Sequence, residues 1–234
     1  ILSSRPNQKE TKKVKHHVYG IISVKKYFSA GDWLKKVKND IFICLKKKKI
    51  PIIVGGTGLY FNTITKGISK IPDIDLKTRF KVRNLYKRVG LKAFYQRLIK
   101  LDPKAKNKIL PTDSQRVQRA YEVKLKTKKS LFDWFANTKS DFLDFDIRKI
   151  FLDIPREELL QKISKRTEQM FKSKCINEVK NFNKLKVNKT LSANKMIGVK
   201  EINDYLRGHI NIEKCKDLIN IKTRQYAKRQ NTWA

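Results

Sequence analysis

The sequence predicts an α/β fold, in which an all-helical insertion interrupts the core and a helix-rich half completes the chain. Two short apolar runs, at 50–54 and 148–153, have the composition of buried strands. Residues 75–140, between these runs, carry apolar residues at helical spacing. We therefore expect an α/β core made of residues 1–74 and 141–234, with a helical insertion domain at 75–140.

The first elements follow from polarity and spacing. Residues 1–20 are polar and basic, and we expect a loop there. A helix is predicted from Asp32 to about Lys48, and a second, short helix ends at Thr65. The longer helix is recognised by one apolar face, made of Leu34, Val37, Ile41 and Cys44 or Leu45.

The insertion and the C-terminal half are punctuated by prolines and a capping residue. Pro103 and Pro111 interrupt the insertion. Asp113 or Ser114 can cap the helix that follows. Pro155 stands in the first-turn position that proline tolerates, and so opens a new helix. The apolar stripes of the insertion comprise Leu85, Leu91, Phe94, Leu98 and Leu101.

The charge of the chain is strongly positive. Lys and Arg number 56 and Asp and Glu 21, which gives a formal net charge of +35. Such an excess favours a polyanionic partner, because bound Lys and Arg release counterions from phosphates. Nucleic acid is the partner that the charge indicates. The alternative is a lysine-rich surface that reflects biased codon usage alone.

The cysteines and histidines indicate neither a disulfide framework nor a metal site. Cys44, Cys175 and Cys215 are widely spaced and odd in number, as in proteins of a reducing cytoplasm. The adjacent His16 and His17 point in different directions and make a poor metal pair. No apolar run of about 18 residues is present, so no membrane span is expected.

A glycine-rich turn follows the first apolar run. Gly55, Gly56 and Gly58 allow a sharp turn and close approach to a bound group, and Thr57 places a hydroxyl there. Open α/β sheets bind ligands beyond the carboxyl ends of their strands, where this turn is expected. The alternative is a strand-to-helix turn without chemistry.

Three basic helical segments are candidate binding sites. Gln115 to Arg119 combines Arg with Gln, which suits RNA phosphates and base edges. Arg166 could clamp an anionic group with two hydrogen bonds. Arg224, with Lys228 and Arg229, forms a patch that could grip a phosphate backbone. Each segment could equally be an ordinary solvated helix face.

Taken together, these residues resemble the tRNA dimethylallyltransferase family, whose members prenylate the adenosine next to the anticodon. The resemblance runs nearly end to end. It rests on Ser4-Arg5-Pro6, His16-His17, Tyr27 with Ser29-Ala30, Pro51 to Phe61, Gly67, Pro72, Asp113 to Glu122, Arg166 with Gln169-Met170, Ile197-Gly198, Thr223-Arg224-Gln225 and Lys228-Arg229-Gln230 with Trp233.

The resemblance implies a fold related to the P-loop kinases, with a parallel-sheet core and the helical insertion. It also implies transfer of a dimethylallyl group from dimethylallyl diphosphate to N6 of the adenosine 3′ of the anticodon. Mg²⁺ would assist departure of the pyrophosphate. The expected partners are a tRNA anticodon stem-loop and dimethylallyl diphosphate, and we expect a monomer in the cytoplasm.

The resemblance also assigns roles to residues. Thr57 would orient the target adenosine, and Arg166 would neutralise the pyrophosphate leaving group. Gly55, Gly56 and Gly58 would form the loop beside the substrate. The residues implied to contact tRNA are Thr57, Arg79, Gln115, Arg116, Val117, Gln118, Arg119, Lys195, Lys200 and Arg224.

Some family features are missing from the sequence. The phosphate-binding Gly-Lys-Ser/Thr loop, which supplies a Mg²⁺ ligand, and the Asp-Ser pair with the general base would lie upstream of Ile1. Gly20 stands where relatives usually have an acid, and Val199 where many have an aromatic. The chain is therefore expected to be an N-terminally truncated and inactive fragment. The alternative is a non-catalytic tRNA-binding relative.

Overall fold

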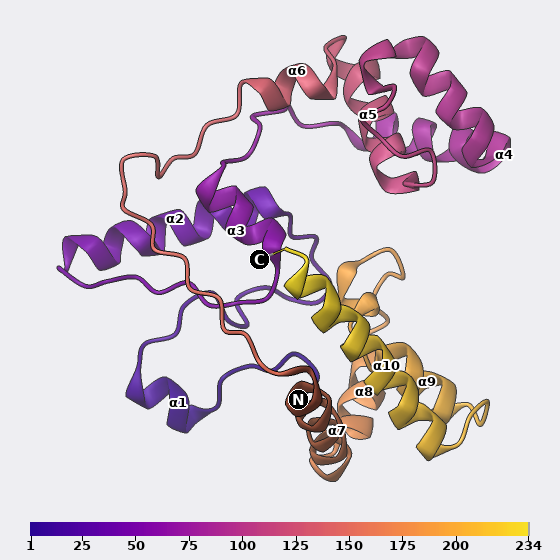
Figure 1. Ribbon diagram of the computed structural model, residues 1–234. Helices are drawn as coiled ribbons and strands as arrows, with labels where there is room; N and C mark the ends of the chain where they lie inside the picture. The colour runs from indigo at the N-terminus through magenta and orange to yellow at the C-terminus, as the bar shows by residue number, and fades with distance from the viewer. Residues whose placement is uncertain (234) are drawn as a thin grey trace. The chain divides into compact units, whose positions relative to one another are not determined.

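The computed structural model describes residues 1–233, which divide into two compact units (Figure 1). One unit comprises Ile1–Phe61 and the chain from Ile147 onward, and the other comprises Asn62–Asp146. The second unit is inserted within the sequence of the first. Its bounds differ from the expected insertion at 75–140 by including the segments on both sides.

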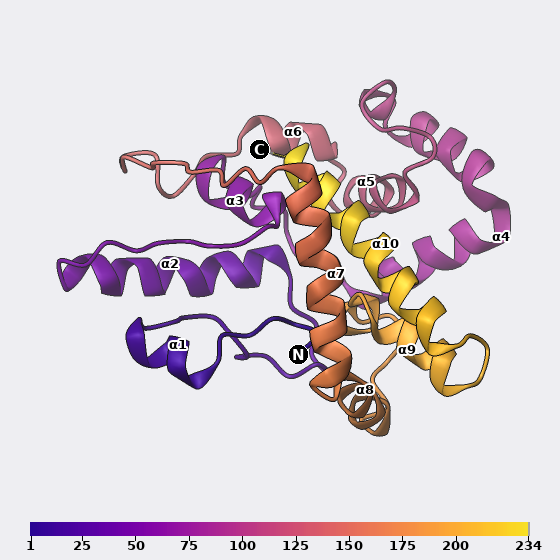
Figure 2. The same ribbon diagram turned by 60° about the horizontal axis from the view of Figure 1, so that its bottom comes forward.

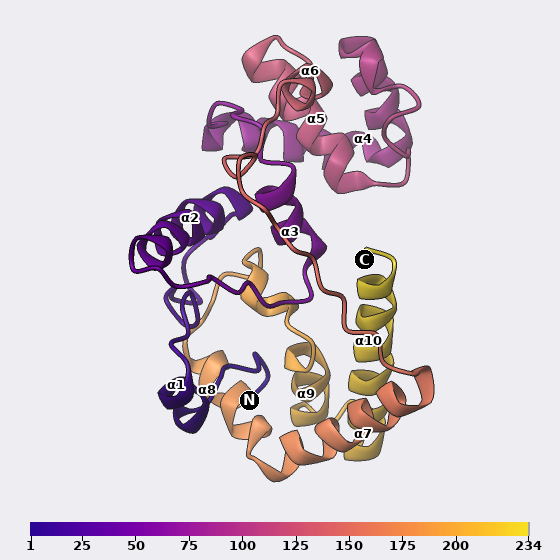
Figure 3. The same cartoon turned by 60° about the vertical axis from the view of Figure 1, so that its left-hand side comes forward.

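All the regular secondary structure of the inserted unit is helical. It contains α4 (Leu76–Leu101), the 3-10 helix η1 (Pro103–Ala105), α5 (Ser114–Thr127) and α6 (Leu131–Ala136). The helix α5 packs along α4 (Figure 3). Gly90, with a φ of 74°, kinks α4. Residues that fill the core between these helices include Val82, Phe94, Leu98, Val117, Ala120 and Val123.

Local capping explains where the helices of this unit begin. Asp113 caps α5, because its side chain accepts a hydrogen bond from the backbone N–H of Arg116 at 3.0 Å. The expected capping by Asp113 or Ser114 is therefore confirmed for Asp113. Ser130 caps α6 and also donates a buried hydrogen bond to Asp102, at 2.7 Å. This bond satisfies a carboxylate that burial would otherwise penalise.

The N-terminal part of the other unit has three helices, α1 (Gln8–Lys13), α2 (Ala30–Lys46) and α3 (Gly58–Thr65), of which α3 ends beyond Phe61. The expected helices at 32–48 and up to Thr65 are confirmed. The helix α1 was expected to be a loop. It forms because Asn7 and Glu10 make a reciprocal capping box, a short polar signal that apolar spacing cannot detect.

Four helices form the C-terminal part of this unit (Figure 2). They are α7 (Arg156–Lys172), α8 (Cys175–Lys184), α9 (Val199–Leu206) and α10 (Ile212–Asn231), with the 3-10 helix η2 (Ser192–Lys195). A helix does begin at Pro155 as predicted, but its first residue is Arg156, so Pro155 stands just before the first turn and makes no side-chain capping hydrogen bond. The helix α10 packs on both α7 and α9. Their shared core contains Met170, Cys175, Val179, Val199, Ile202, Cys215 and Ile219.

The two cysteines in this core, Cys175 and Cys215, are not activated as nucleophiles. Cys44, Cys175 and Cys215 are all free thiols. Burial raises the pKa of the Cys215 thiol to about 12, and it also raises the pKa of Cys175. The reactive species of a thiol is its thiolate, so neither group is poised as a nucleophile.

The predicted strands do not form among residues 1–233. Segments 50–54 and 148–153 have no regular secondary structure. Their apolar side chains are uncovered, with Ile50 87%, Ile52 82% and Ile150 85% exposed. A strand requires a neighbouring strand for its hydrogen bonds, and neither segment finds one in the described chain. The expectation of a sheet core is therefore not confirmed here.

No helix among residues 1–233 combines the length and the apolar character needed to cross a membrane.

A buried ion pair joins α9 to α10. Glu201 has a side chain only 3% exposed and accepts hydrogen bonds from Lys222 and from the backbone N–H of Gly198. Burial raises the pKa of Glu201, but these hydrogen bonds outweigh it, and the pKa is lowered from its ordinary value of 4.5. The stabilisation by the carboxylate is thus complete above pH 4.5 and is lost as pH falls through the lowered pKa.

We predict that Glu201→Ala lowers the free energy of unfolding by about 2–3 kcal/mol at neutral pH, because it strands the N–H of Gly198 and removes a charged hydrogen bond. Glu168→Ala is the matched control, since Glu168 pairs with Lys216 at an exposed site. Urea unfolding measures both. A Glu201→Ala variant that unfolds at the same urea concentration as Glu168→Ala would contradict the prediction.

Candidate active site and nucleic-acid surface

The glycine-rich turn lies against the C-terminal end of α10. The hydroxyl of Thr57 is 3.3 Å from that of Tyr226. A Cβ atom on Gly56 would come within 1.8 Å of Gln230, and one on Gly58 within 2.3 Å of the Trp233 ring. A side chain at either glycine would therefore require Gln230 or Trp233, about 170 positions away, to move.

The helix that follows the turn is fixed by an aromatic pair. Tyr60 of α3 stacks on Trp33 of α2, with ring centroids 4.4 Å apart and an interplanar angle of 10°. Such pairs contribute about 0.5–1.5 kcal/mol beyond the area they bury. Tyr60 therefore anchors α3 on α2 and holds the N-terminal end of α3, where Thr57 lies, in a defined position.

Arg166 projects from α7 into a cavity of about 680 Å³. Its guanidinium donates a hydrogen bond to Ser4, which is 162 residues away. Arg5 and Lys13 also line the cavity, together with Glu10. Glu10 accepts a hydrogen bond from the backbone N–H of Asn7, within the cap of α1.

The cavity around Arg166 is therefore suited to an anion. Three cations, Arg166, Arg5 and Lys13, line the cavity together with one acid, Glu10. Glu10 already accepts a hydrogen bond from Asn7. A side chain at Gly20 would lie 2.6 Å from the Arg5 guanidinium, so the bare glycine leaves room for Arg5. Guanidinium groups recognise phosphate oxygens with paired hydrogen bonds. The sequence pointed to Arg166, but it did not single out Arg5, whose only signal was the Ser4-Arg5-Pro6 motif.

Thr57 and Arg166 belong to the same unit, but they contact different residues. Thr57 lies beside Tyr226 of α10 and does not line the cavity around Arg166. The residues expected to handle the adenosine and the leaving group are thus held separately, each by contacts distant in sequence.

The inserted unit carries the predicted RNA-contact segment on α5. Arg116 pairs with Asp113 at 3.3 Å, and Arg119 with Glu122 at 3.7 Å. Gln118 donates a hydrogen bond to the backbone carbonyl of Ser114 at 3.1 Å. The side chains of Gln115, Arg116, Gln118 and Arg119 remain wholly or partly accessible.

Val117 and Arg79 differ from these residues. The Val117 side chain is completely buried, so it serves the core of the unit and cannot contact RNA. Arg79, on α4, has a buried Nε without a hydrogen-bond partner among the described residues. A buried polar atom is normally satisfied, so this Nε is an exception in the unit, and its burial keeps it out of reach of an RNA phosphate.

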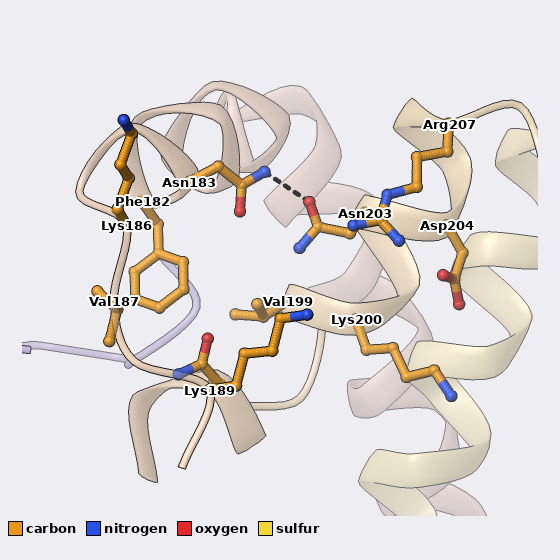
Figure 4. Close-up of a pocket in the computed structure, with 11 residues that line it drawn as sticks. Phe182, Asn183, Lys186, Val187, Lys189, Val199, Lys200, Asn203, Asp204 and Arg207 are labelled. Carbon is orange, nitrogen blue, oxygen red and sulfur yellow. Dashed lines mark hydrogen bonds between the residues drawn. The ribbon is translucent and has the colours of Figure 1, made fainter. Parts of the chain in front are cut away.

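The remaining predicted RNA contacts lie on the C-terminal helices. Lys195 ends η2 and is exposed, and Arg224 is exposed on α10. Lys200 lines a pocket between α8 and α9 (Figure 4). These cations belong to the unit that contains Thr57 and Arg166, whereas Gln115 to Arg119 belong to the inserted unit.

The described residues offer no multidentate metal site. Among residues 1–233, no three His, Cys, Asp or Glu side chains come together in a group that could hold a metal ion. We therefore assign no Mg²⁺ ligand to these residues.

The chain is similar to known tRNA-modifying enzymes along its whole length. The family model described as IPP transferase matches residues 1–234. A tRNA dimethylallyltransferase of Pelagibacter ubique (strain HTCC1062) is 51% identical over 234 residues, which is 100% of this chain and 75% of the relative. That of Rickettsia typhi (strain ATCC VR-144 / Wilmington) is 38% identical, with the same coverage of 100% and 75%.

Solved structures of such enzymes resemble the fold. The tRNA isopentenylpyrophosphate transferase of Bacillus halodurans is 29% identical, with a TM-score of 0.66 over 99% of this chain and 72% of that one. A eukaryotic dimethylallyltransferase, solved acting on tRNA, is 26% identical, with a TM-score of 0.82 over 99% of this chain and 59% of that one.

We predict that Gly58→Ala displaces the Trp233 ring, because its Cβ would overlap that ring. Gly55→Ala is the control, since nothing lies within 4 Å of a Cβ built there. Fluorine NMR of protein labelled with fluorotryptophan reports on the three tryptophans separately, once Trp233→Phe has assigned the signal. A Trp233 resonance that moves equally in both variants would count against the packing of the turn on α10.

Proposed function

The chain belongs to the IPP transferase family, and we propose how its residues serve the family's reaction, tRNA modification by dimethylallyl transfer. The observation that carries the assignment is 51% identity to a tRNA dimethylallyltransferase across all 234 residues. The chain is accordingly a prenyltransferase by family. The donor is proposed to be dimethylallyl diphosphate, and the acceptor N6 of the adenosine 3′ of the anticodon.

The transfer exchanges one bond for another. The bond between the dimethylallyl carbon and the diphosphate oxygen breaks, and the bond between that carbon and N6 forms. Negative charge develops on the departing diphosphate, and N6 gives up a proton. The protein must therefore hold the diphosphate, orient the unstacked adenosine and keep the two reactants aligned.

Arg166 is proposed to bind the diphosphate in the cavity that it lines. Arg5 and Lys13 face the same cavity and would share the developing charge. Fixed cations stabilise a leaving group without having to reorganise during the reaction. The hydrogen bond from Arg166 to Ser4 orients the guanidinium before the substrate arrives.

Thr57 is proposed to orient the adenosine. Its hydroxyl can both donate and accept a hydrogen bond, and Tyr226 occupies one of these positions at 3.3 Å. The remaining position would face the base. Gly56 and Gly58 let the turn pack closely on Gln230 and Trp233, and Gly55, where a Cβ would meet no other described residue within 4 Å, would let the backbone approach the substrate.

RNA binding is proposed to use the accessible cations of both units. Gln115, Arg116, Gln118 and Arg119 on α5 combine phosphate neutralisation with hydrogen bonding. Arg79, Lys195, Lys200 and Arg224 would neutralise phosphates. A net charge of +35 supports a polyanionic partner. Mg²⁺ is a family expectation, and the reaction would take place in the cytoplasm.

We also propose that 50–54 and 148–153 are strands of a parallel sheet in the natural protein. Parallel strands are covered on both faces and read as nearly continuous apolar runs, as these two segments do. Their exposed apolar side chains support this proposal. If it holds, the backbone amides of Ile52 and Ile150 exchange slowly with solvent in the gene product at its natural length. If these amides exchange as fast as those of an unfolded chain, the proposal of a sheet is wrong.

The proposed function predicts that the gene product at its natural length transfers dimethylallyl groups to tRNA, and that Arg166→Ala lowers kcat roughly 10²–10³-fold, as loss of a transition-state donor does elsewhere. Arg156→Ala, which removes an exposed arginine from the same helix, is the matched control. Nucleoside analysis of tRNA detects the product.

Two outcomes would contradict this assignment. Equal kcat values for the Arg166 and Arg156 variants would remove Arg166 from the diphosphate site. Tight tRNA binding without any transfer by the natural protein would indicate a non-catalytic tRNA-binding relative instead.

A further inference from the structure

A pocket of about 400 Å³ lies between α8 and α9, under the loop that joins them (Figure 4). This volume is within the usual range for small ligands. The loop is held in place by Asn194, whose side-chain amide donates to the backbone carbonyls of Asn188 and Leu191. The pocket is therefore a built feature of the C-terminal helices.

The floor of the pocket is apolar. Phe182 of α8 presents a partly exposed ring, with Val187 and the buried Val199 beside it. A flat aromatic face that solvent can reach is a stacking platform for a nucleobase. The Phe182 ring also packs on the core of the C-terminal helices, which fixes its orientation.

Two amides form a recognition edge beside this floor. The Asn183 amide donates to the side-chain oxygen of Asn203 at 2.6 Å, as Figure 4 shows. This bond leaves the Asn183 oxygen as an acceptor and the Asn203 side-chain NH2 group as a donor. An adjacent donor and acceptor can pair with the Watson–Crick edge of a base, on which donors and acceptors also stand side by side.

The rim of the pocket is positively charged. Its cations are Lys186, Lys189, Lys200 and Arg207, against one acid, Asp204. None of these cations forms an ion pair with the residues that the structure describes. Three lysines of neighbouring helices, Lys162 of α7 and Lys216 and Lys222 of α10, are paired with Glu. Cations without an ion-pair partner, placed around a stacking platform, can bind the phosphate of a nucleotide.

We propose that this pocket binds one unstacked nucleotide of the tRNA, distinct from the adenosine that is prenylated at Thr57. The base stacks on Phe182, its edge is read by Asn183 and Asn203, and its phosphate lies among the rim cations. The proposal rests on tRNA being the substrate. It makes the pocket a second point at which the enzyme reads the RNA.

The test is an abasic scan of an anticodon stem-loop RNA. Each loop nucleotide is replaced in turn by an abasic one, and the Kd is measured by fluorescence anisotropy at fixed salt. The scan uses the unmodified protein and Phe182→Leu, which retains an apolar side chain but loses the flat ring. At one position, loss of the base weakens binding to the unmodified protein roughly tenfold, and to Phe182→Leu less than about twofold.

The rim is tested separately with Lys186→Gly. Lys186 has a φ of 49°, which glycine adopts without strain, so this variant removes the charge without straining the fold. It is expected to lower the slope of log K against log salt by about one. Lys214→Ala is the control, since Lys214 is an exposed lysine of α10 outside the pocket, and a lysine there contributes no such loss.

The outcomes separate the pocket from the proposed function. Additive effects of Phe182→Leu and base removal at every position would overturn the pocket. If one loop position is coupled to Phe182→Leu but no dimethylallyl group is transferred, the pocket is supported and the proposed reaction is rejected. If dimethylallyl groups are transferred but no loop position is coupled to Phe182→Leu, the proposed reaction is supported and the pocket is rejected. Thermal unfolding confirms that each variant is folded.

Discussion

Packing of α10 against α7 and α9 is the interaction on which the rest of the candidate site depends. One end of α10 completes the core with Cys215 and Ile219, and the other end carries Tyr226, Gln230 and Trp233 to the glycine-rich turn. The helix α7 presents Arg166, and α9 presents Asn203. One helix therefore sets the positions of the turn, the anion cavity and the pocket between α8 and α9.

Two polar contacts secure this packing. Thr167 of α7 donates a hydrogen bond to Asn220 of α10 at 2.6 Å, and Lys222 of α10 reaches Glu201 of α9. A buried polar group costs free energy when its partner is lost, so these contacts also penalise a shifted helix register. Apolar packing alone would tolerate such a shift more readily.

Sequence reasoning succeeded where the information is local. The apolar faces of α2 and α4, the cap at Asp113 and the start of α7 after Pro155 each follow from a few neighbouring residues. The two strands could not be settled in this way, since a strand is defined by a partner elsewhere in the chain. The helix α1 was missed because its signal is a polar cap of four residues.

The candidate site shows the same limit. Composition singled out the glycine-rich turn, and the family resemblance singled out Arg166. Ser4, which orients Arg166, lies 162 residues away, and Asn183 and Asn203 are 20 residues apart in the sequence. Such pairs emerge only when the helices that carry them have packed.

The ion pairs on α5 have a consequence for selectivity. Arg116 and Arg119 are already neutralised by Asp113 and Glu122. A phosphate that binds these arginines competes with the carboxylates for their charge, so part of the gain on binding offsets the pairs that are weakened. A polyanion that fits poorly obtains little from this exchange, whereas a backbone that matches the spacing of the arginines obtains more. On a chain so rich in lysine, internal competition of this kind weakens indiscriminate adsorption and favours shape-matched RNA.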